Sequence, residues 1–169
     1  IPRRNVVEAN IGPSVDKTWE QILIKLSHSQ TGNNPLTNQI RLGNIMARMR
    51  MVYLFDTARA HRALVVGTEN KSEMYLGYFT RFGDEASDIE PIRHLYKTQV
   101  RQLALYLKLP QLILDQPPTA GLWADQTDEA ELGFTYELAD QVLYLSFDKQ
   151  MSSKEIVKTI AREDKMKPG

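Results

Sequence analysis

Residues 64–73 combine an apolar run with groups that could bind phosphate and a metal ion. The apolar start predicts a short buried strand, and ligands of open parallel sheets bind where strands end. Gly67 permits close approach of a ligand to the backbone, Thr68 offers a hydroxyl, and the following helix begins with N–H groups that favour anions. Glu73, one turn into that helix, could hold Mg²⁺ through one carboxylate. The alternative is that Thr68 or Asn70 only caps the helix and Glu73 is solvated.

A second group of chemically useful side chains follows at residues 77–84 and Asp88. The aromatic rings of this segment could stack on a nucleotide, and Arg81 could neutralise a phosphate. Asp88 could accept hydrogen bonds from hydroxyl or amide groups. The alternative is a surface turn whose rings fill a small satellite core.

Two further features are a lysine that could bind phosphate and a long segment that could close over a substrate. Lys97 lies on an amphipathic helix, where a lysine suits the phosphates of ATP as a mobile point charge. The alternative is that it belongs to a solvated helix face. Residues 116–133 contain two prolines and two glycines and predict a long loop, which could close over a substrate and exclude water. The alternative is a surface crossing held in place by Trp123.

Three arginines share one edge of a long helix predicted over residues 37–62. At helical spacing Arg41, Arg48 and Arg59 lie within about 20° of one another beside the apolar stripe. Such an edge could line an interface that binds a phosphate-rich ligand. The alternative is a solvated helix face.

These residues need elements to position them, and the chain predicts short strands that alternate with helices. We expect strands at 6–11 and 63–66 and helices at 14–26, 37–62, 70–75, 94–108, 136–147 and from 152 onwards, with a loop at 30–35. This alternation predicts an α/β fold with a parallel sheet. Because two strands make a poor sheet, we expect partner strands in an amino-terminal part outside this sequence, or strands that the pattern does not reveal.

Composition narrows the possible functions. The 169 residues fit one domain, with 42% apolar and 25% charged residues. The 21 basic and 21 acidic side chains cancel, which argues against nucleic-acid binding, and no apolar run is long enough to predict a membrane span. No cysteine is present, so a thiol nucleophile and thiolate metal sites are excluded, and the three histidines lack metal-ligand spacing. A metal here would be a hard cation on oxygen ligands.

The order of these segments resembles the NAD synthetase family. The matching runs are 47–51, 67–73, 77–84, 88–92, 95–100, 118–123, 126–129 and 131–133. They cover roughly residues 6–145 and correspond to the carboxy-terminal two-thirds of an ammonia-dependent enzyme. The resemblance implies one domain over residues 1–169 with a three-layer α/β/α parallel sheet of the adenine-nucleotide alpha-hydrolase-like, or ATP pyrophosphatase, type. We expect that sheet to be incomplete here at its amino-terminal side.

The resemblance also implies which residues bind ATP and magnesium. Thr68, Lys97 and Thr119 would contact ATP, and Glu73 would be a ligand of Mg²⁺. The pyridine carboxylate of deamido-NAD would attack ATP to give an acyl adenylate and pyrophosphate. Ammonia would then displace AMP and form NAD. The enzyme would thus be a ligase that forms a C–N bond, and the missing cysteine fits the ammonia-dependent type, since a glutaminase needs one.

The second substrate is implied to bind elsewhere on the chain. Arg48, Arg81 and Asp88 would contact deamido-NAD at a homodimer interface of a cytoplasmic protein. Asp84 and Lys97 would lie close to the reacting groups as catalytic residues.

Some parts of the sequence depart from the family pattern. Nothing matches the pyrophosphate-binding loop Ser-Gly-Gly-x-Asp-Ser, so we expect no synthetase activity if these residues are the whole polypeptide. Glu85 and Ala86 replace a usual pair of glycines, and Arg81 stands where lysine is common. Two alternatives stay open. One is another amidating ligase of the ATP pyrophosphatase type, such as a GMP synthetase. The other is a non-catalytic, nucleotide-binding dimerisation fragment.

Overall fold

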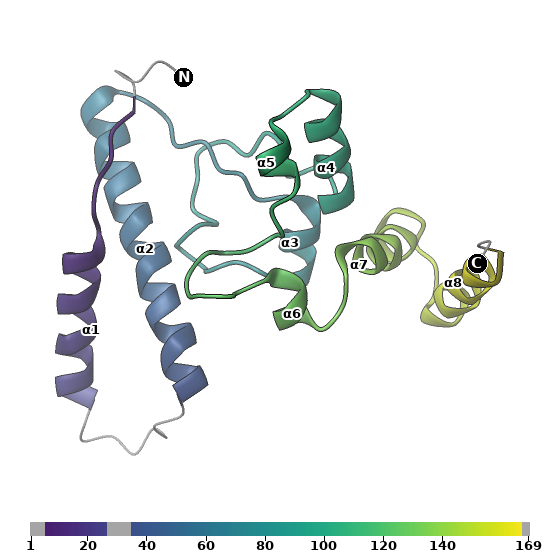
Figure 1. The fold of residues 1–169 in the computed structure, drawn as a ribbon, viewed down its shortest axis with the longest axis horizontal. Coiled ribbons are helices and arrows are strands. Elements are labelled where there is room, and N and C mark those ends of the chain that lie inside the picture. The colour runs from purple at the N-terminus through teal and green to yellow at the C-terminus, as the bar shows by residue number, and fades with distance from the viewer. Residues whose placement is uncertain (1–5, 27–34, 167–169) are drawn as a thin grey trace. The chain divides into compact units, whose positions relative to one another are not determined.

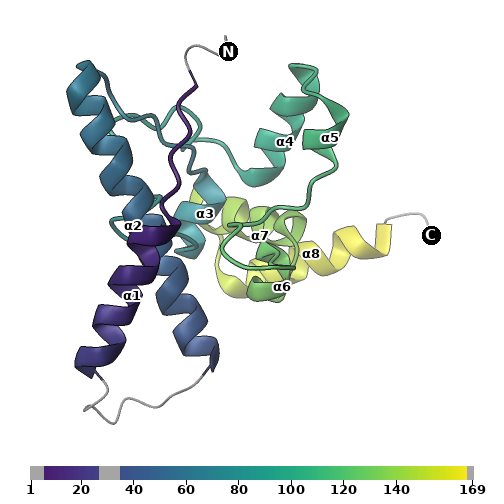
Figure 2. The same ribbon diagram turned by 60° about the vertical axis from the view of Figure 1, so that its left-hand side comes forward.

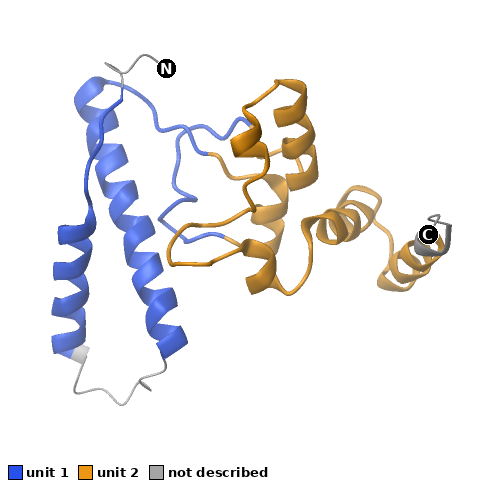
Figure 3. Ribbon diagram, viewed as in Figure 1, with its two compact units in different colours: residues 1–67, 79–91 blue, residues 68–78, 92–169 orange. Residues whose placement is uncertain are grey.

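The computed structural model describes residues 6–26 and 35–166. The chain divides into two compact units (Figure 3). Unit 1 comprises the residues up to Gly67 together with 79–91, and unit 2 comprises 68–78 and the residues from 92 onwards. None of the helices in this part of the chain combines the length and apolar character that a membrane crossing demands.

Unit 1 is built on a helical hairpin. Helices α1 (Gly12–Leu26) and α2 (Pro35–His61) lie side by side and run antiparallel (Figure 1, Figure 2). The Arg41 guanidinium on α2 lies 5.1 Å from the centroid of the Trp19 ring on α1, a cation–π contact that joins the helices. Ala47 on α2 is buried. The long predicted helix is thus confirmed, and Arg41, one of the three arginines on its edge, takes part in packing the hairpin, whereas Arg48 and Arg59 are exposed.

The two predicted strands are not formed by the described residues. Residues 6–11 have no regular secondary structure, and 63–66 contributes only to an isolated parallel bridge between Val66 and Ile89. The Gly67 N–H donates to the Ile89 carbonyl at 2.8 Å within that bridge. A strand persists only when a neighbouring strand pairs with its N–H and C=O groups. Because no other described segment supplies that partner, the expected parallel sheet is absent from this part of the chain.

Unit 2 gathers the remaining elements around a small core. In chain order they are α3 (Lys71–Leu76), α4 (Lys97–Tyr106), α5 (Gln111–Leu114), α6 (Asp128–Leu132), α7 (Tyr136–Leu143), the π-helical turn η2 (Tyr144–Asp148) and α8 (Ser153–Met166). The buried apolar and aromatic residues are Tyr96, Tyr136, Ala139, Leu143 and Ile156. Helices near 70–75, 94–108, 136–147 and after 152 were predicted, and all four are confirmed.

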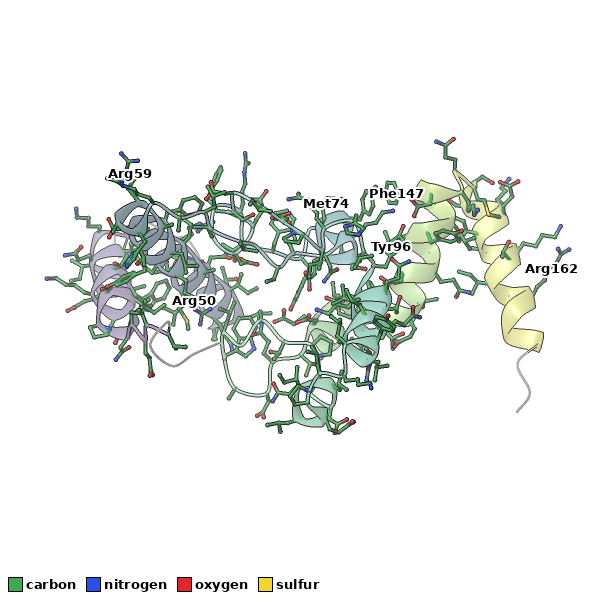
Figure 4. All side chains as sticks on the ribbon, turned by 90° about the horizontal axis from the view of Figure 1, so that it is seen from above. Arg50, Arg59, Met74, Tyr96, Phe147 and Arg162 are labelled. Carbon is green, nitrogen blue, oxygen red and sulfur yellow. The ribbon has the colours of Figure 1, made fainter. Side chains whose placement is uncertain are left out.

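The turn η2 ties α3 and the start of α4 to the end of α7. Phe147 stacks on Tyr75 of α3, with ring centroids 4.1 Å apart. Asp148 accepts a hydrogen bond from Lys71 Nζ at 2.6 Å and another from the Tyr96 hydroxyl, and the Lys71 contact lowers the pKa of Asp148. Figure 4 labels Tyr96 and Phe147 among the side chains of this unit.

Two predicted loops need comment. The single loop expected over 116–133 is wrong, because α6 interrupts it. Its start is capped by Thr127, whose hydroxyl accepts the Ala130 N–H at 3.3 Å. The loop predicted at 30–35 lies outside the described residues except for Pro35, the first residue of α2. Proline is favoured at that position, because its missing N–H is not needed there.

Candidate functional site

Glu73 and Lys97 meet at the starts of α3 and α4. The Lys97 Nζ lies 2.7 Å from Glu73 Oε1, with 26% and 17% of the two side chains exposed. Glu73 Oε2 accepts the Asn70 N–H at 3.1 Å. The Lys97 Nζ also lies 5.2 Å from the centroid of the Tyr136 ring. Two of the predicted site residues are therefore in direct contact, and the cation is held between a carboxylate and an aromatic face.

The backbone N–H groups at the start of α3 are occupied. Asn70 Oδ1 accepts the N–H groups of Ser72 and Glu73, each at 3.1 Å, and the Lys71 N–H donates to the Leu95 carbonyl at 2.8 Å. The expectation that this helix end offers free N–H groups to an anion is therefore wrong, and the capping alternative holds for Asn70. A phosphate at this place would have to meet a side-chain cation instead.

A buried carboxylate close to this pair was not identified from the sequence. Asp140 Oδ2 accepts the Thr98 N–H at 2.8 Å, and Oδ1 accepts a hydrogen bond from the Ser72 hydroxyl. Asp140 is 5% exposed and Ser72 is fully buried. A signal was present, since Asp140 has helical spacing from Tyr136 and Leu143 and so lies on the apolar face of α7. An aspartate on an inward face needs internal partners.

One acidic residue of the 116–133 segment, Asp128, turns inward rather than to solvent. Asp128 is 3% exposed, and its Oδ2 accepts the Tyr136 hydroxyl at 3.0 Å, whereas its Oδ1 has no hydrogen-bond partner among the described residues. Burial raises the pKa of Asp128, and burial next to Asp128 raises the pKa of Tyr136. The Tyr78 hydroxyl donates to Glu131 Oε2 at 2.6 Å, and burial together with this bond raises the pKa of Tyr78.

A cavity of about 540 Å³ opens beside Lys97 within unit 2. Its walls include Arg101 of α4, residues 113–118 and Tyr136. A volume of this size lies in the range of small-molecule sites. Lys97 therefore faces a hollow that could admit part of a ligand.

The two threonines predicted to bind ATP lie in unit 2. Thr68 is exposed, immediately before the buried Glu69. Thr119 is also exposed, and its hydroxyl accepts the Gly121 N–H at 3.0 Å. Among the described contacts, none joins either threonine to Lys97. The structure thus brings together two of the four residues predicted to bind ATP and magnesium.

In unit 1 the two predicted arginines come together. The Arg48 Nε–H donates to the Arg81 carbonyl at 3.1 Å, and the Arg81 guanidinium lies 4.7 Å from the centroid of the Phe82 ring. Both arginines are exposed. The structure therefore joins the start of the 81–88 loop to α2 and places two guanidinium groups on residues in direct contact.

The two aspartates of that loop each accept a backbone N–H. Asp84 Oδ1 accepts the Thr80 N–H at 2.9 Å, and Asp88 Oδ2 accepts the Val65 N–H at 2.8 Å. Asp84 thus shapes the turn at the start of the loop, and Asp88 joins the end of the loop to residues 63–66. Gly83 is required in the same turn, because a Cβ there would lie 2.9 Å from Thr80 and 3.0 Å from Ala47.

The described residues show no ready-made cluster of metal ligands. They contain no group of three histidine, cysteine, aspartate or glutamate side chains able to hold a metal. Magnesium bound to nucleotide phosphates commonly needs only one or two protein carboxylates. Glu73, at the start of α3 beside a cation and a cavity, fits that requirement.

Comparison with known proteins decides the family. A family model described as NAD synthase matches residues 5–167. The chain belongs to the NAD synthase family. An NH(3)-dependent NAD(+) synthetase of Chlorobium phaeobacteroides (strain DSM 266) is 48% identical over 123 residues, which cover 73% of this chain and 44% of that relative. The Pyrococcus furiosus enzyme of the same description is 44% identical over 147 residues, covering 87% of this chain and 53% of that relative.

The chain spans about half the length of these curated NAD synthase relatives. A solved NMN synthetase from Francisella tularensis matches with 39% identity and a TM-score of 0.70, over 89% of this chain and 57% of that chain. The resemblance predicted from the ordered motifs is confirmed. The fold of the family is supported by this structural match, whereas its sheet is not formed by the described residues.

Proposed function

We propose that this chain carries the part of an ammonia-dependent NAD synthetase that holds Mg·ATP and deamido-NAD. The reaction is the ATP-dependent conversion of the deamido-NAD carboxylate into an amide, with release of AMP and pyrophosphate. Family membership supports the proposal, and the observation that carries it is the 2.7 Å contact between Glu73 and Lys97 beside a cavity. Magnesium bound to a phosphate could separate these two side chains, because the metal can bind the carboxylate and the phosphate can bind the ammonium group.

The chemistry proceeds in two steps. A carboxylate is a poor acylating agent, so its oxygen first attacks the α-phosphorus of ATP, and the P–O bond to pyrophosphate breaks. The acyl adenylate then loses AMP when the nitrogen of ammonia attacks the carbonyl carbon, and ammonia gives up a proton as the amide forms. No protein nucleophile is needed, which agrees with the absence of cysteine from the sequence.

Glu73 and Lys97 share the work of stabilising phosphate charge in this proposal. Lys97 turns its ammonium from Glu73 Oε1 to phosphate oxygens, and Glu73 holds the magnesium ion that arrives with them. Magnesium, when bound, offsets charge that develops on the departing pyrophosphate. Because the N–H groups at the start of α3 are already bonded, Lys97 and the magnesium ion that Glu73 would hold, rather than helix-end amides, would supply the positive potential.

The threonines would complete the ATP contacts. Thr68 follows the isolated bridge, and Thr119 stands next to Pro118 on the cavity wall. Both are exposed and so accessible to a ligand. The segment around Thr119 would shelter the adenylate from water, which would otherwise hydrolyse it.

Deamido-NAD would bind through unit 1. Arg48 and Arg81 supply guanidinium groups suited to its phosphates. Asp88 would accept hydrogen bonds from the substrate, and Asp84 would lie near the reacting groups. In the proposed homodimer, two copies of the chain would form the deamido-NAD site together.

A chimera tests this function directly. The 123 residues that align with the Chlorobium phaeobacteroides relative would be exchanged into that enzyme. We expect the chimera to make NAD and AMP from deamido-NAD, Mg·ATP and ammonium.

Variants of the chimera test the charged pair. Glu73→Ala or Lys97→Met should lower the rate of NAD formation on the order of a hundredfold. The matched control is Lys71→Met, which removes a lysine paired with Asp148. Equal rates in Glu73→Ala and the unmodified chimera would reject the proposal.

A second candidate substrate follows from one structural match. The 39% identity to an NMN synthetase favours a smaller acid substrate. That substrate would be nicotinate mononucleotide, which contains one nucleotide where deamido-NAD contains two. The same chimera can be supplied with either acid at equal concentration. Faster AMP release with nicotinate mononucleotide would favour the smaller substrate, and faster release with deamido-NAD would favour the larger one.

A further inference from the structure

Asp140 is a buried charge that the proposed reaction does not use. It lies on α7 with 5% of its surface exposed, and it accepts hydrogen bonds from the Ser72 hydroxyl and from the Thr98 N–H. Burying a carboxylate is costly unless its oxygens are bonded. The residues to which it bonds stand directly beside the two members of the charged pair, Ser72 before Glu73 and Thr98 after Lys97.

Ser72 completes the connection between the two helix starts. Its Oγ accepts the Lys97 N–H at 2.8 Å while its hydroxyl proton is donated to Asp140. Ser72 is fully buried, so this hydroxyl has no exposure to water. Asp140 on α7 therefore restrains the Thr98 backbone directly and the Lys97 backbone through Ser72. Ser72 is also the residue immediately before Glu73.

The chemistry of the contacts requires an acceptor at Asp140. An ionised carboxylate only accepts hydrogen bonds, and here it meets one O–H and one N–H. Both donors belong to the first turns of α3 and α4, where the helix dipoles also favour negative charge. An amide at this position could accept the Thr98 N–H and donate its own N–H to Ser72 Oγ, but the buried Ser72 hydroxyl proton would then lose its acceptor. Asp140→Asn thus weakens the connection through Ser72 while leaving the side-chain volume nearly unchanged.

We propose that Asp140 is a positioning residue that, with Ser72, sets Glu73 and Lys97 against each other so that the pair can take up Mg·ATP. This role rests on the proposed function of that pair. It differs from ordinary packing in a measurable way. Loss of packing would loosen α3 and α4 generally, whereas loss of positioning would change the surroundings of Lys97 in particular.

The chain offers a matched control for this distinction. Asp148 in η2 is also a carboxylate that reaches both helix starts, through Lys71 at 2.6 Å and through the Tyr96 hydroxyl. It contacts side chains rather than the backbone next to the pair. Asp148→Asn therefore weakens the attachment of the same elements without removing the connection through Asp140.

Competitive acetylation of lysines, read by mass spectrometry of peptides, tests the geometry in the 169-residue chain. In Asp140→Asn we expect Lys97 to be acetylated about fivefold faster and Lys71 at the same rate as in the unmodified chain. In Asp148→Asn we expect the reverse pattern. An unchanged Lys97 rate in Asp140→Asn, or equal increases at both lysines, would overturn the proposal. If Asp140→Asn does not fold by circular dichroism, Ser72→Ala takes its place with the same expected pattern.

Calorimetric titration with Mg·ATP separates this proposal from the proposed function. We expect binding to weaken about tenfold in Asp140→Asn and to be unchanged in Asp148→Asn. Equal affinity in Asp140→Asn and the unmodified chain would reject the positioning role. If the unmodified chain binds no Mg·ATP but the acetylation pattern is as expected, Asp140 still positions the pair and the proposed nucleotide function fails.

Discussion

The Lys97 ammonium lies 2.7 Å from a Glu73 carboxylate oxygen, so each side chain neutralises the other. A magnesium ion at Glu73 would leave Lys97 without its partner, and a phosphate at Lys97 would do the same to Glu73. When both arrive together, each charge exchanges one partner for another. The pair is therefore suited to bind a metal–phosphate complex more readily than either component alone.

The cap of α3 is expected to contribute to stability. Asn70 accepts the N–H groups of Ser72 and Glu73, and Glu73 returns a bond to the Asn70 N–H. Asn70→Ala should lower the free energy of unfolding by about 1 kcal/mol, because it leaves helix-end donors unsatisfied. Asn70→Ser keeps a capping acceptor without burying a new charge at this 2% exposed position, and it should change the free energy by only a few tenths of that. Urea unfolding of the three proteins is the measurement, and equal midpoints would show that the cap contributes nothing.

The stability of the protein should depend on pH through Asp128. Because burial raises the pKa of Asp128, the folded state keeps that proton to higher pH than the unfolded chain, where the ordinary value is 3.8. The contribution of Asp128 to the free energy of unfolding therefore falls as the pH rises from 3.8 through the folded-state pKa, and it stays low above that pKa. Asp128→Asn removes this loss and can still accept the Tyr136 hydroxyl.

Melting temperatures of both proteins between pH 3 and pH 8 check this expectation. The melting temperature of Asp128→Asn relative to the unmodified chain should increase with pH. A difference that is constant across the range would show that Asp128 does not titrate in the way its burial implies.

Gly83 should tolerate no side chain. A Cβ at this position would lie 2.9 Å from the Thr80 methyl group and 3.0 Å from the Ala47 Cβ. Gly83→Ala should therefore lower the free energy of unfolding by roughly 1–3 kcal/mol and weaken deamido-NAD binding through the displaced Arg81 loop. Adding Thr80→Ser removes the nearest methyl group but keeps the hydroxyl that bonds Asn44. The double variant should recover part of the stability in urea unfolding, and no recovery would argue against the steric explanation.

Helices could be predicted well because their signals are local. The apolar spacing on α2 is such a signal, and the structure confirms that helix. The strands could not be established in the same way, because their stability depends on segments distant in the chain. Val66 finds only Ile89 as a partner among the described residues.

The candidate site was predictable in part. Motif order indicated Glu73 and Lys97 separately, and the structure joins them. Capping of α3 by Asn70 was the alternative stated from the sequence, whereas the bond from the Lys71 N–H to the Leu95 carbonyl could not be predicted, because it connects residues far apart in sequence. Asp140 was missed because an aspartate is usually exposed, although its helical spacing placed it on a buried face.

The magnesium dependence of ATP binding tests the central claim most directly. Calorimetric titration of ATP into the chain, with Mg²⁺ and with a chelator, would be done for the unmodified chain and for Glu73→Gln. The account predicts that Mg²⁺ strengthens binding on the order of tenfold in the unmodified chain and has little effect in Glu73→Gln. In that variant ATP alone should bind more tightly, because Lys97 is no longer neutralised. An identical response to Mg²⁺ in both proteins would contradict the account.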